Sequence, residues 1–297
     1  FLKPTIYYVH TKGFTAACCA IPVDEGELNW TEPIRSYVPF TNTVDSVVGQ
    51  RATIQDALSH NRGLAYIDLT WLGVECDSNF DKKDLLEVIS HLPPVHDLRI
   101  GFHYNNCMYA VAGLVIEQQS GRPWYEFLKE KILEPLGMHR TVRHRKKLPH
   151  GNVAEPHVVI DGYSLHRQKP VDTAADDTFM GLAGGVWSNV SDMMKWAKLS
   201  STPGTNSLRR EYIRNTRSAI MALGNSHGLG DGPDWSAQAI IQAMFDLQPP
   251  IDFAEVSGQR AKTEHKRYAR LAADFVYFRH EERRNEEQLN IDLAGYV

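Results

Sequence analysis

The chain has 297 residues, of which 42% are hydrophobic, which is enough for one large globular domain or two closely joined ones. A formal net charge of −4 gives no basic surface for nucleic acid, and the short basic run from Arg143 to Lys147 is too small to change that, so we interpret this run as a solvated loop. No apolar stretch reaches about 18 residues, so we expect no membrane-spanning segment.

The cysteines and histidines predict neither a metal site nor a cofactor. The four cysteines, Cys18, Cys19, Cys76 and Cys107, have no metal-ligand spacing, and the 13 histidines form no H-E-x-x-H or H-x-H pattern. Reduced thiols in a core of ordinary size favour a cytoplasmic protein, and no signal peptide is visible at the start of the sequence. We expect Cys18 and Cys19 to be small core residues of a helix.

The first third of the chain predicts a strand followed by helices. After "TIYYV", the stretch "TKGFTAACCAIPVDEG" has apolar residues at helical spacing and ends with Gly26 at a C-cap site. We expect Pro22 to kink or shorten its last turns. Further on, "TIQDALSH" begins with Thr53 and carries Asp56 three residues later, which is the pattern of a helix capping box.

The middle of the chain predicts two consecutive helices. "NCMYAVAGLVIEQQSG" is amphipathic and closes at Gly121. "PWYEFLKEKILEPLGM" begins with Pro123 at a first-turn position and stops at Pro135. Helices therefore occupy most of this region.

The remaining elements are expected in chain order as follows: loops and short strands over 148–179, a short strand and an amphipathic helix over 181–201, a buried strand over 218–226, a helix over 234–247, and a charged helix over 260–290. The whole pattern favours an α/β or α+β fold, with an antiparallel sheet flanked by helices and an all-helical cluster beside it.

Five segments, in this order, resemble the serine β-lactamase-related superfamily, which includes class C β-lactamases, penicillin-binding-protein-like peptidases, esterases and fungal acyltransferases. They are "TIYYVHTKGFTAACCAIPVDEGELNWTEPI", "TIQDALSHNRGL", "FHYNNCMYAVAGLVIEQQSGRPWYEFLKEKILEPLGMHRT", "AGGVWSNVSDMMKWAK" and "ALGNSHGLGDGPDWSAQAIIQAMFDL". The resemblance implies a single domain over 1–290, with a helical part roughly over 40–200, an incomplete sheet, and the start of a truncated β module at 291–297.

The resemblance also implies catalytic roles for particular residues. Such proteins use a serine and a lysine in S-x-x-K, one helix turn apart, together with a Y-x-N loop. Lys12 matches the lysine that takes the serine proton, Tyr104 the tyrosine that relays it, and Asn106 the asparagine that orients lysine and substrate. The alternatives are that Lys12 is an exposed helix-start lysine, Tyr104 a half-buried loop aromatic, and Asn106 an ordinary helix N-cap. The close match of the flanking sequence to the family favours the catalytic roles.

Two parts of the family pattern are absent from the sequence. The family pattern T-x-(F/Y)-x-(I/V)-A-S-x-(T/S)-K is longer than the interval from Thr5 to Lys12 by two residues, which we interpret as a deletion of Ala-Ser after Val9. No H-x-G or K-[TS]-G, the third motif, follows in the chain. Other candidate nucleophiles fit poorly, because Thr11 neighbours Lys12 on the helix at about 100°, His10 is a weak acyl acceptor, and Cys18 and Cys19 lie too far along the helix.

The resemblance implies a serine hydrolase or acyltransferase that acts on an ester, thioester or amide of a small-molecule acyl substrate, and the missing serine implies impaired activity. One alternative is a non-catalytic relative that binds a small molecule or a partner in the old cleft. Another is an ordinary enzyme whose sequence here lacks short internal segments, and the intact Lys12 and Tyr104 favour this over the non-catalytic relative. The number of subunits stays open.

Overall fold

The computed structural model describes residues 5–6, 8–61, 63–65, 67, 80–143, 153, 157–159, 165–167, 178–201, 226–227, 251–263, 265–267 and 269–270. The chain divides into two compact units, of which the first comprises Phe1–Pro156 with Lys169–Asn225 and the second His157–Gln168 with Ser226–Val297.

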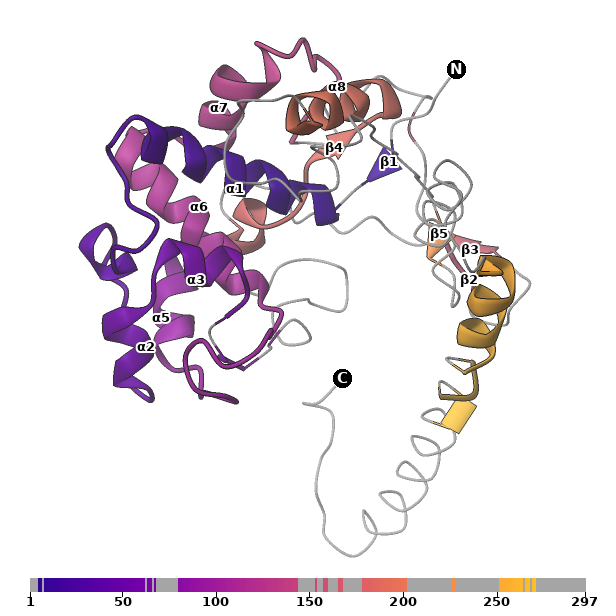
Figure 1. Ribbon diagram of the computed structural model, residues 1–297, viewed down its shortest axis with the longest axis horizontal. Helices are drawn as coiled ribbons and strands as arrows, with labels where there is room; N and C mark the ends of the chain where they lie inside the picture. Colours follow the sequence, from indigo (N-terminus) through magenta and orange to yellow (C-terminus); the bar gives the residue numbers. More distant parts are fainter. Residues whose placement is uncertain are drawn as a thin grey trace, which may run out of the picture. The chain divides into compact units, whose positions relative to one another are not determined.

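The first unit is mainly helical in its described residues (Figure 1). It includes every candidate site residue. In chain order its described elements are β1 (Thr5–Ile6), α1 (Tyr8–Asp24), η1 (Ile34–Ser36), α2 (Ser46–Arg51), α3 (Ile54–Leu58), η2 (Lys82–Asp84), α5 (Leu85–Ser90), α6 (Asn106–Ser120), α7 (Trp124–Leu128), the π-helical turn η3 (Lys129–Leu133), η5 (Phe179–Leu182), β4 (Trp187–Ser188) and α8 (Val190–Ser201).

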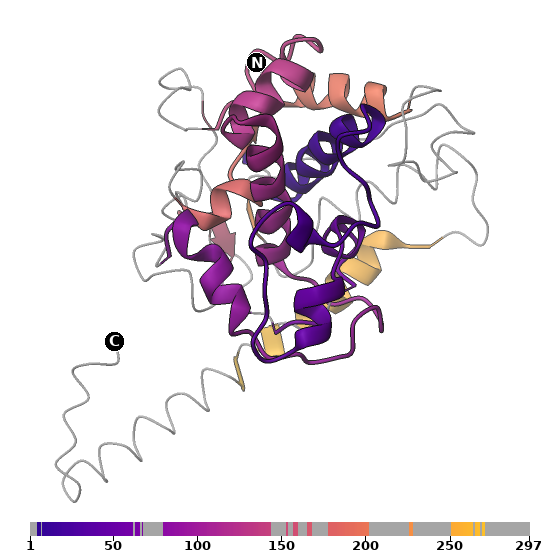
Figure 2. The ribbon, with the colours of Figure 1, turned by 90° about the vertical axis from the view of Figure 1, so that its left-hand side faces the viewer.

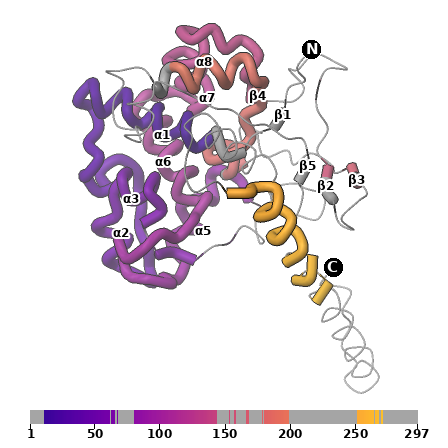
Figure 3. Tube along the Cα trace, turned by 45° about the vertical axis from the view of Figure 1, so that its right-hand side comes forward, coloured from indigo at the N-terminus to yellow at the C-terminus, as the bar shows by residue number. Residues whose placement is uncertain are grey.

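Helix α6 is the centre of this unit. Helices α1, α3, α5 and α7 and the short helix η5 all pack against it, as two perpendicular views show (Figures 1 and 2). Ten of its residues, from Asn106 to Ile116, are buried, because apolar side chains occupy nearly all of its circumference. The tube trace shows α1 and α6 side by side (Figure 3).

A close approach joins α6 to η5. A Cβ atom at Gly113 would lie 2.7 Å from the Cβ of Leu182, closer than any real Cβ contact. Glycine at position 113 therefore lets η5, and the segment that follows it, lie directly on α6.

The strands that the structure describes are short. Within the first unit, β1 pairs antiparallel with β4, in the register Thr5 to Ser188 and Ile6 to Trp187, and Val142 bridges the other side of Trp187. Within the second unit, β2 (His157–Val159) pairs antiparallel with β3 (Leu165–Arg167) and parallel with β5 (Ser226–His227). The second unit also contains helical residues at 253–263 and 265–267.

Several predicted helix ends are confirmed. Helix α1 ends at Asp24, and Gly26 follows with a φ of 79°. The Thr53–Asp56 capping box at α3 is present, with both reciprocal hydrogen bonds. Gly121 closes α6 in the left-handed conformation.

Three local predictions need correction. Asn105, not Asn106, is the N-cap of α6, where its side chain accepts the N–H of Met108. Pro123 is the N-cap of α7 and so stands one position earlier than predicted. Arg143, predicted in a solvated loop, has only 1% of its surface exposed, and its backbone is hydrogen-bonded to the buried Tyr125.

Other predictions fall outside the described residues. These are the strand at 218–226 apart from Ser226, the helix at 234–247, the segment 291–297, and the interval in which the third motif would stand. Among the described residues, no helix is both long and apolar enough to cross a membrane.

Candidate active site

The side chain of Lys12 lies in the second turn of α1, and 9% of its surface is exposed. Its Nζ donates a hydrogen bond of 3.3 Å to the carbonyl oxygen of Ala183, in the segment that follows η5. The reading of Lys12 as an exposed helix-start lysine is therefore wrong, because the amine points into the protein.

Two threonines of α1 hold the same segment. The hydroxyl of Thr15 donates to the carbonyl of Leu182 over 3.0 Å, and the hydroxyl of Thr11 accepts the N–H of Val186 over 3.3 Å. Both threonines are fully buried. The position of Lys12 relative to Ala183 is thus fixed by hydrogen bonds on either side of it.

Tyr104 and Asn106 lie where α6 begins, close to Lys12. The Nζ of Lys12 is 5.1 Å from the centroid of the Tyr104 ring, within the range of a cation–π contact. The Tyr104 hydroxyl donates to Oδ1 of Asn106 over 3.1 Å. The structure therefore brings together the three residues singled out in the sequence, with 39% of the surface of Tyr104 exposed and Asn106 buried.

A fourth residue, which the sequence did not single out, completes the cluster. The ring of His60 contacts Tyr104 at 4.6 Å between centroids and Tyr109 at 5.0 Å. Tyr109, one turn into α6, is also 5.4 Å from Nζ of Lys12, and its hydroxyl donates to Leu58 O over 2.7 Å. His60 stands in the family-like segment "TIQDALSHNRGL", but nothing in that pattern indicates a contact with a tyrosine 44 positions later.

The backbone of α1 already includes position 9. Because α1 begins at Tyr8, Val9 stands in the helix three residues before Lys12, on the turn from which the serine of S-x-x-K would project. The helix therefore already has a residue at that position, and this residue is a valine, which has no hydroxyl group.

Comparison with known protein families shows to which family the chain belongs. The model of the family described as β-lactamase matches residues 10–242, which is more than half of the chain and includes Lys12, Tyr104 and Asn106. The chain belongs to the β-lactamase family.

Individual relatives agree with this assignment. The chain is 26% identical over 212 residues to an unguisins hydrolase of Aspergillus violaceofuscus, covering 66% of this chain and 36% of that protein. It is 29% identical over 133 residues to penicillin-binding protein 4 of Amycolatopsis lactamdurans, covering 44% of this chain and 34% of that protein. The chain thus spans little more than a third of the length of these curated relatives.

Solved structures show the β-lactamase/transpeptidase-like fold. A penicillin-binding protein homologue from Pyrococcus abyssi, titled as octameric, aligns with a TM-score of 0.57 at 23% identity over 75% of this chain and 50% of that one. A D-stereospecific amidohydrolase from Streptomyces aligns with a TM-score of 0.58 at 18% identity over 74% of this chain and 66% of that one.

Cys18 and Cys19 of this β-lactamase-family chain are unsuited to act as nucleophiles. Cys18 and Cys19 are buried, as their predicted core role requires, Cys107 is also buried, and Cys76 lies outside the described residues. Burial raises the pKa of Cys19 to about 12, and burial together with Cys19 raises that of Cys18. Protonated thiols are weak nucleophiles, and the Thr11 hydroxyl is engaged with Val186.

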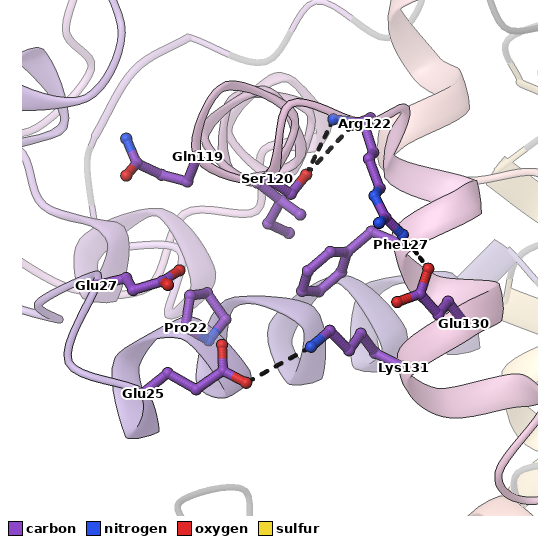
Figure 4. A pocket seen from close by; sticks show the side chains of 10 residues that line it. Pro22, Glu25, Glu27, Gln119, Ser120, Arg122, Phe127, Glu130 and Lys131 are labelled. Carbon is purple, nitrogen blue, oxygen red and sulfur yellow. Dashed lines mark hydrogen bonds and ion pairs between the residues drawn. The ribbon is translucent and has the colours of Figure 1, made fainter.

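A hollow of about 250 Å³ lies elsewhere in the first unit, where the C-terminal ends of α1 and α6 approach α7 and η3 (Figure 4). Pro22 lines it, about 15 Å along α1 from Lys12 at 1.5 Å per residue. Its cations already pair with its carboxylates, Lys131 with Glu25 and Arg122 with Glu130. The hollow therefore adds nothing to the cluster around Lys12. Among the described residues, no group of His, Cys, Asp or Glu could hold a metal ion.

Proposed function

We propose that this chain carries the proton-transfer half of a β-lactamase-type acyl-transfer site, in a hydrolase or acyltransferase that acts on an ester, thioester or amide through an acyl-enzyme. The observation that carries the proposal is the buried Lys12 amine beside the Tyr104 ring, with the Tyr104 hydroxyl bonded to Asn106. The relatives named as an unguisins hydrolase and a D-stereospecific amidohydrolase support hydrolysis of an acyl bond.

Each residue has a distinct part in this chemistry. A hydroxyl one turn before Lys12 attacks the acyl carbon, and the Lys12 amine takes its proton as the new C–O bond forms. When the bond to the leaving group breaks, the Tyr104 hydroxyl passes a proton to that group. The Asn106 amide holds the Tyr104 hydroxyl in place and is available to the substrate. Water, or another acceptor, then releases the acyl group.

Position 9, three residues before Lys12 where the serine of S-x-x-K would stand, is a valine and supplies no such hydroxyl. We therefore propose that hydrolysis by this chain is strongly impaired. A second candidate function, small-molecule binding without catalysis, rests on the same valine, since a site without its nucleophile can still bind a substrate.

Restoring the serine in two ways tests the proposal. One variant is Val9→Ser, which uses the helix position already present; the other inserts Ala-Ser between Val9 and His10. The matched controls are Val9→Ala and an Ala-Ala insertion. Hydrolysis of p-nitrophenyl butyrate should rise at least about 100-fold in one serine variant, a small part of the ~10⁶-fold that a nucleophilic serine contributes in proteases, and in neither control.

The rise should also depend on Lys12. Adding Lys12→Met to the active serine variant should return hydrolysis to the control rate, whereas Lys83→Met, at an exposed lysine paired with Asp81, should leave it unchanged. If neither serine variant gains activity while both fold, the proposed acyl-transfer site is refuted and the binding function is favoured.

A further inference from the structure

His60 has a backbone conformation that non-glycine residues rarely adopt. Its φ is 60°, and among the described non-glycine residues this sign is shared with Arg99. Its main chain and its ring both bind the loop that leads into α6: the carbonyl of His60 accepts the N–H of His103 over 2.8 Å, and its Nδ1 accepts the N–H of Asn105 over 3.1 Å. The two bonds enclose Tyr104, which lies between His103 and Asn105.

The ring of His60 also packs against aromatic side chains of that loop and of α6. It lies tilted by 35° on Tyr104, by 40° on Tyr109, and nearly edge-on to Phe102 at 5.2 Å. These are the separations and angles at which aromatic pairs attract one another. His60 and the Lys12 amine therefore contact the same two tyrosine rings.

We propose that His60 is a positioning residue for Tyr104, which holds the phenol beside Lys12 through the ring contact and through the Nδ1 bond to Asn105. An effect of His60 on catalysis rests on the proposed function, whereas the placement of Tyr104 by His60 does not. A ring rotated or displaced at Tyr104 would carry the hydroxyl away from Asn106 and from the path of the proton, and small displacements of a catalytic group lower rates steeply.

The hydrogen bond fixes the protonation state that this role requires. Because Nδ1 accepts the N–H of Asn105, it carries no proton, so the neutral ring bears its proton on Nε2. A second proton on Nδ1 would place a donor against a donor and release the loop. Tyr104, Tyr109 and Phe102 are among the groups that face the ring, and Lys12 lies beyond the two tyrosines.

Nitrogen-15 NMR of the unmodified chain tests the hydrogen bond first. With labelled histidine, the His60 ring should show the Nε2-protonated tautomer at neutral pH, identified by the loss of its signals in His60→Asn. An Nδ1-protonated or doubly protonated ring would overturn the proposal without any variant that must fold.

Fluorine NMR of 3-fluorotyrosine then follows Tyr104 itself, whose resonance is assigned by Tyr104→Phe. His60→Phe keeps a ring and removes the Nδ1 acceptor; His60→Asn keeps an acceptor, tolerates the positive φ and removes the ring. Each should move the Tyr104 resonance by more than its linewidth. Leu85→Ala, at a buried residue of α5, controls for lost stability and should leave that resonance in place. Unmoved resonances in both His60 variants would show a merely structural role.

Activity provides the last test, in the serine variant that hydrolyses p-nitrophenyl butyrate. There His60→Asn and His60→Phe should each lower kcat roughly 10- to 100-fold with little change in KM. An unchanged kcat would overturn the positioning role. If no serine variant is active, the proposed function fails, and the two NMR measurements still decide the placement of Tyr104 by His60.

Discussion

Lys12 differs from a surface lysine in what surrounds its amine. The amine contacts a backbone carbonyl and the faces of two tyrosine rings, and the side chain is almost fully buried. A base must be able to give up its own proton, which lysine can do and arginine cannot. This difference separates a catalytic role for Lys12 from a role as a fixed positive charge.

Lys12→Arg tests that difference. The variant keeps a cation able to donate to Ala183 and to stack on Tyr104, but its guanidinium stays charged. In the active serine variant we expect hydrolysis of p-nitrophenyl butyrate to fall at least about 100-fold, as in Lys12→Met. If Lys12→Arg retained most of the activity, Lys12 would act only through its charge.

Two buried tyrosines should make the fold sensitive to high pH. Burial, and to a smaller extent Cys19 and Tyr104, raises the pKa of Tyr109 to about 12. Burial and Glu126 raise the pKa of Tyr125 to about 12, although Arg143 opposes this. An unfolded tyrosine has a pKa of about 10, so the folded state holds these two protons more tightly.

Their contribution to stability should therefore be complete below about pH 10 and decrease as the pH rises towards 12. Urea unfolding at several pH values across this range measures the slope of the free energy of unfolding against pH. Tyr109→Phe and Tyr125→Phe should each flatten it, because phenylalanine cannot ionise. If the slope were unchanged in the double variant, Tyr109 and Tyr125 would not be the cause of the loss of stability at high pH.

For single residues, the sequence predicts the motif residues but does not predict which residues they contact. Lys12, Tyr104 and Asn106 stand in short patterns with fixed spacing, and the structure brings them together. His60 and Ala183 reach the same cluster from segments far apart in sequence. Only the folded chain reveals those contacts, because no local spacing encodes them.

The carboxylate of Asp56, in helix α3, has two partner residues. Asp56 accepts hydrogen bonds from the backbone N–H and hydroxyl of Thr53 and pairs with Arg99 at 2.9 Å. Burial by itself would raise the pKa of the Asp56 carboxyl, but the hydrogen bonds from Arg99 and Thr53 outweigh it, so the pKa is lowered. Asp56 therefore joins the capping box to the loop that carries Arg99.

Asp56→Asn should lower the free energy of unfolding by about 1–2 kcal/mol at neutral pH, the range for a lost helix cap. Because the folded pKa is lowered, the ionised carboxylate stabilises above about pH 4, and this stabilisation is lost as the pH falls through the folded value. The variant should thus be less sensitive to acid than the unchanged chain. Equal acid sensitivity in denaturant titrations at pH 3 to 7 would refute this role.

The contact between α6 and η5 can be tested by comparing alanine substitutions at a crowded glycine and at an uncrowded one. Gly113→Ala places a Cβ 2.7 Å from that of Leu182, so one of the two elements must shift, at a cost of roughly 1–3 kcal/mol. Gly13→Ala, on α1, meets nothing closer than 3.9 Å and should be neutral or stabilising by up to about 1 kcal/mol.

Thermal unfolding of the two alanine variants measures the difference. Because η5 leads into the segment that accepts the Lys12 hydrogen bond, Gly113→Ala should also weaken the hydrogen bond between Lys12 and Ala183. Equal melting temperatures for the two variants would show that α6 and η5 can separate freely.

Helix ends are well predicted from sequence where one side chain determines them. Gly26, Gly121 and the Thr53 capping box have local causes, namely a positive φ or a side-chain acceptor three residues away. The N-cap at Asn105 was harder to predict, because two successive asparagines can both cap a helix. Its amide also donates to Ala65 O, which settles the choice through a contact outside the helix.

At the scale of the whole molecule, the helical core follows from the pattern of apolar residues, but the sheet does not. Strands such as β1 and β4 have two described residues each, too short for an alternating pattern to reveal. The membership in the β-lactamase family rests instead on the ordered set of motifs and on the match over residues 10–242. The boundary expected at 290 stays a prediction.

We propose that the cluster of Lys12, Tyr104 and Asn106 is an assembled acyl-transfer site that lacks its nucleophile. The most direct measurement is the intact mass of the chain after exposure to a fluorophosphonate, before and after a serine is placed three residues ahead of Lys12. We predict no adduct on the unchanged chain and one adduct on the serine variant, lost again with Lys12→Met. A serine variant that folds but takes no adduct, or an unchanged chain labelled regardless of Lys12, would contradict the claim.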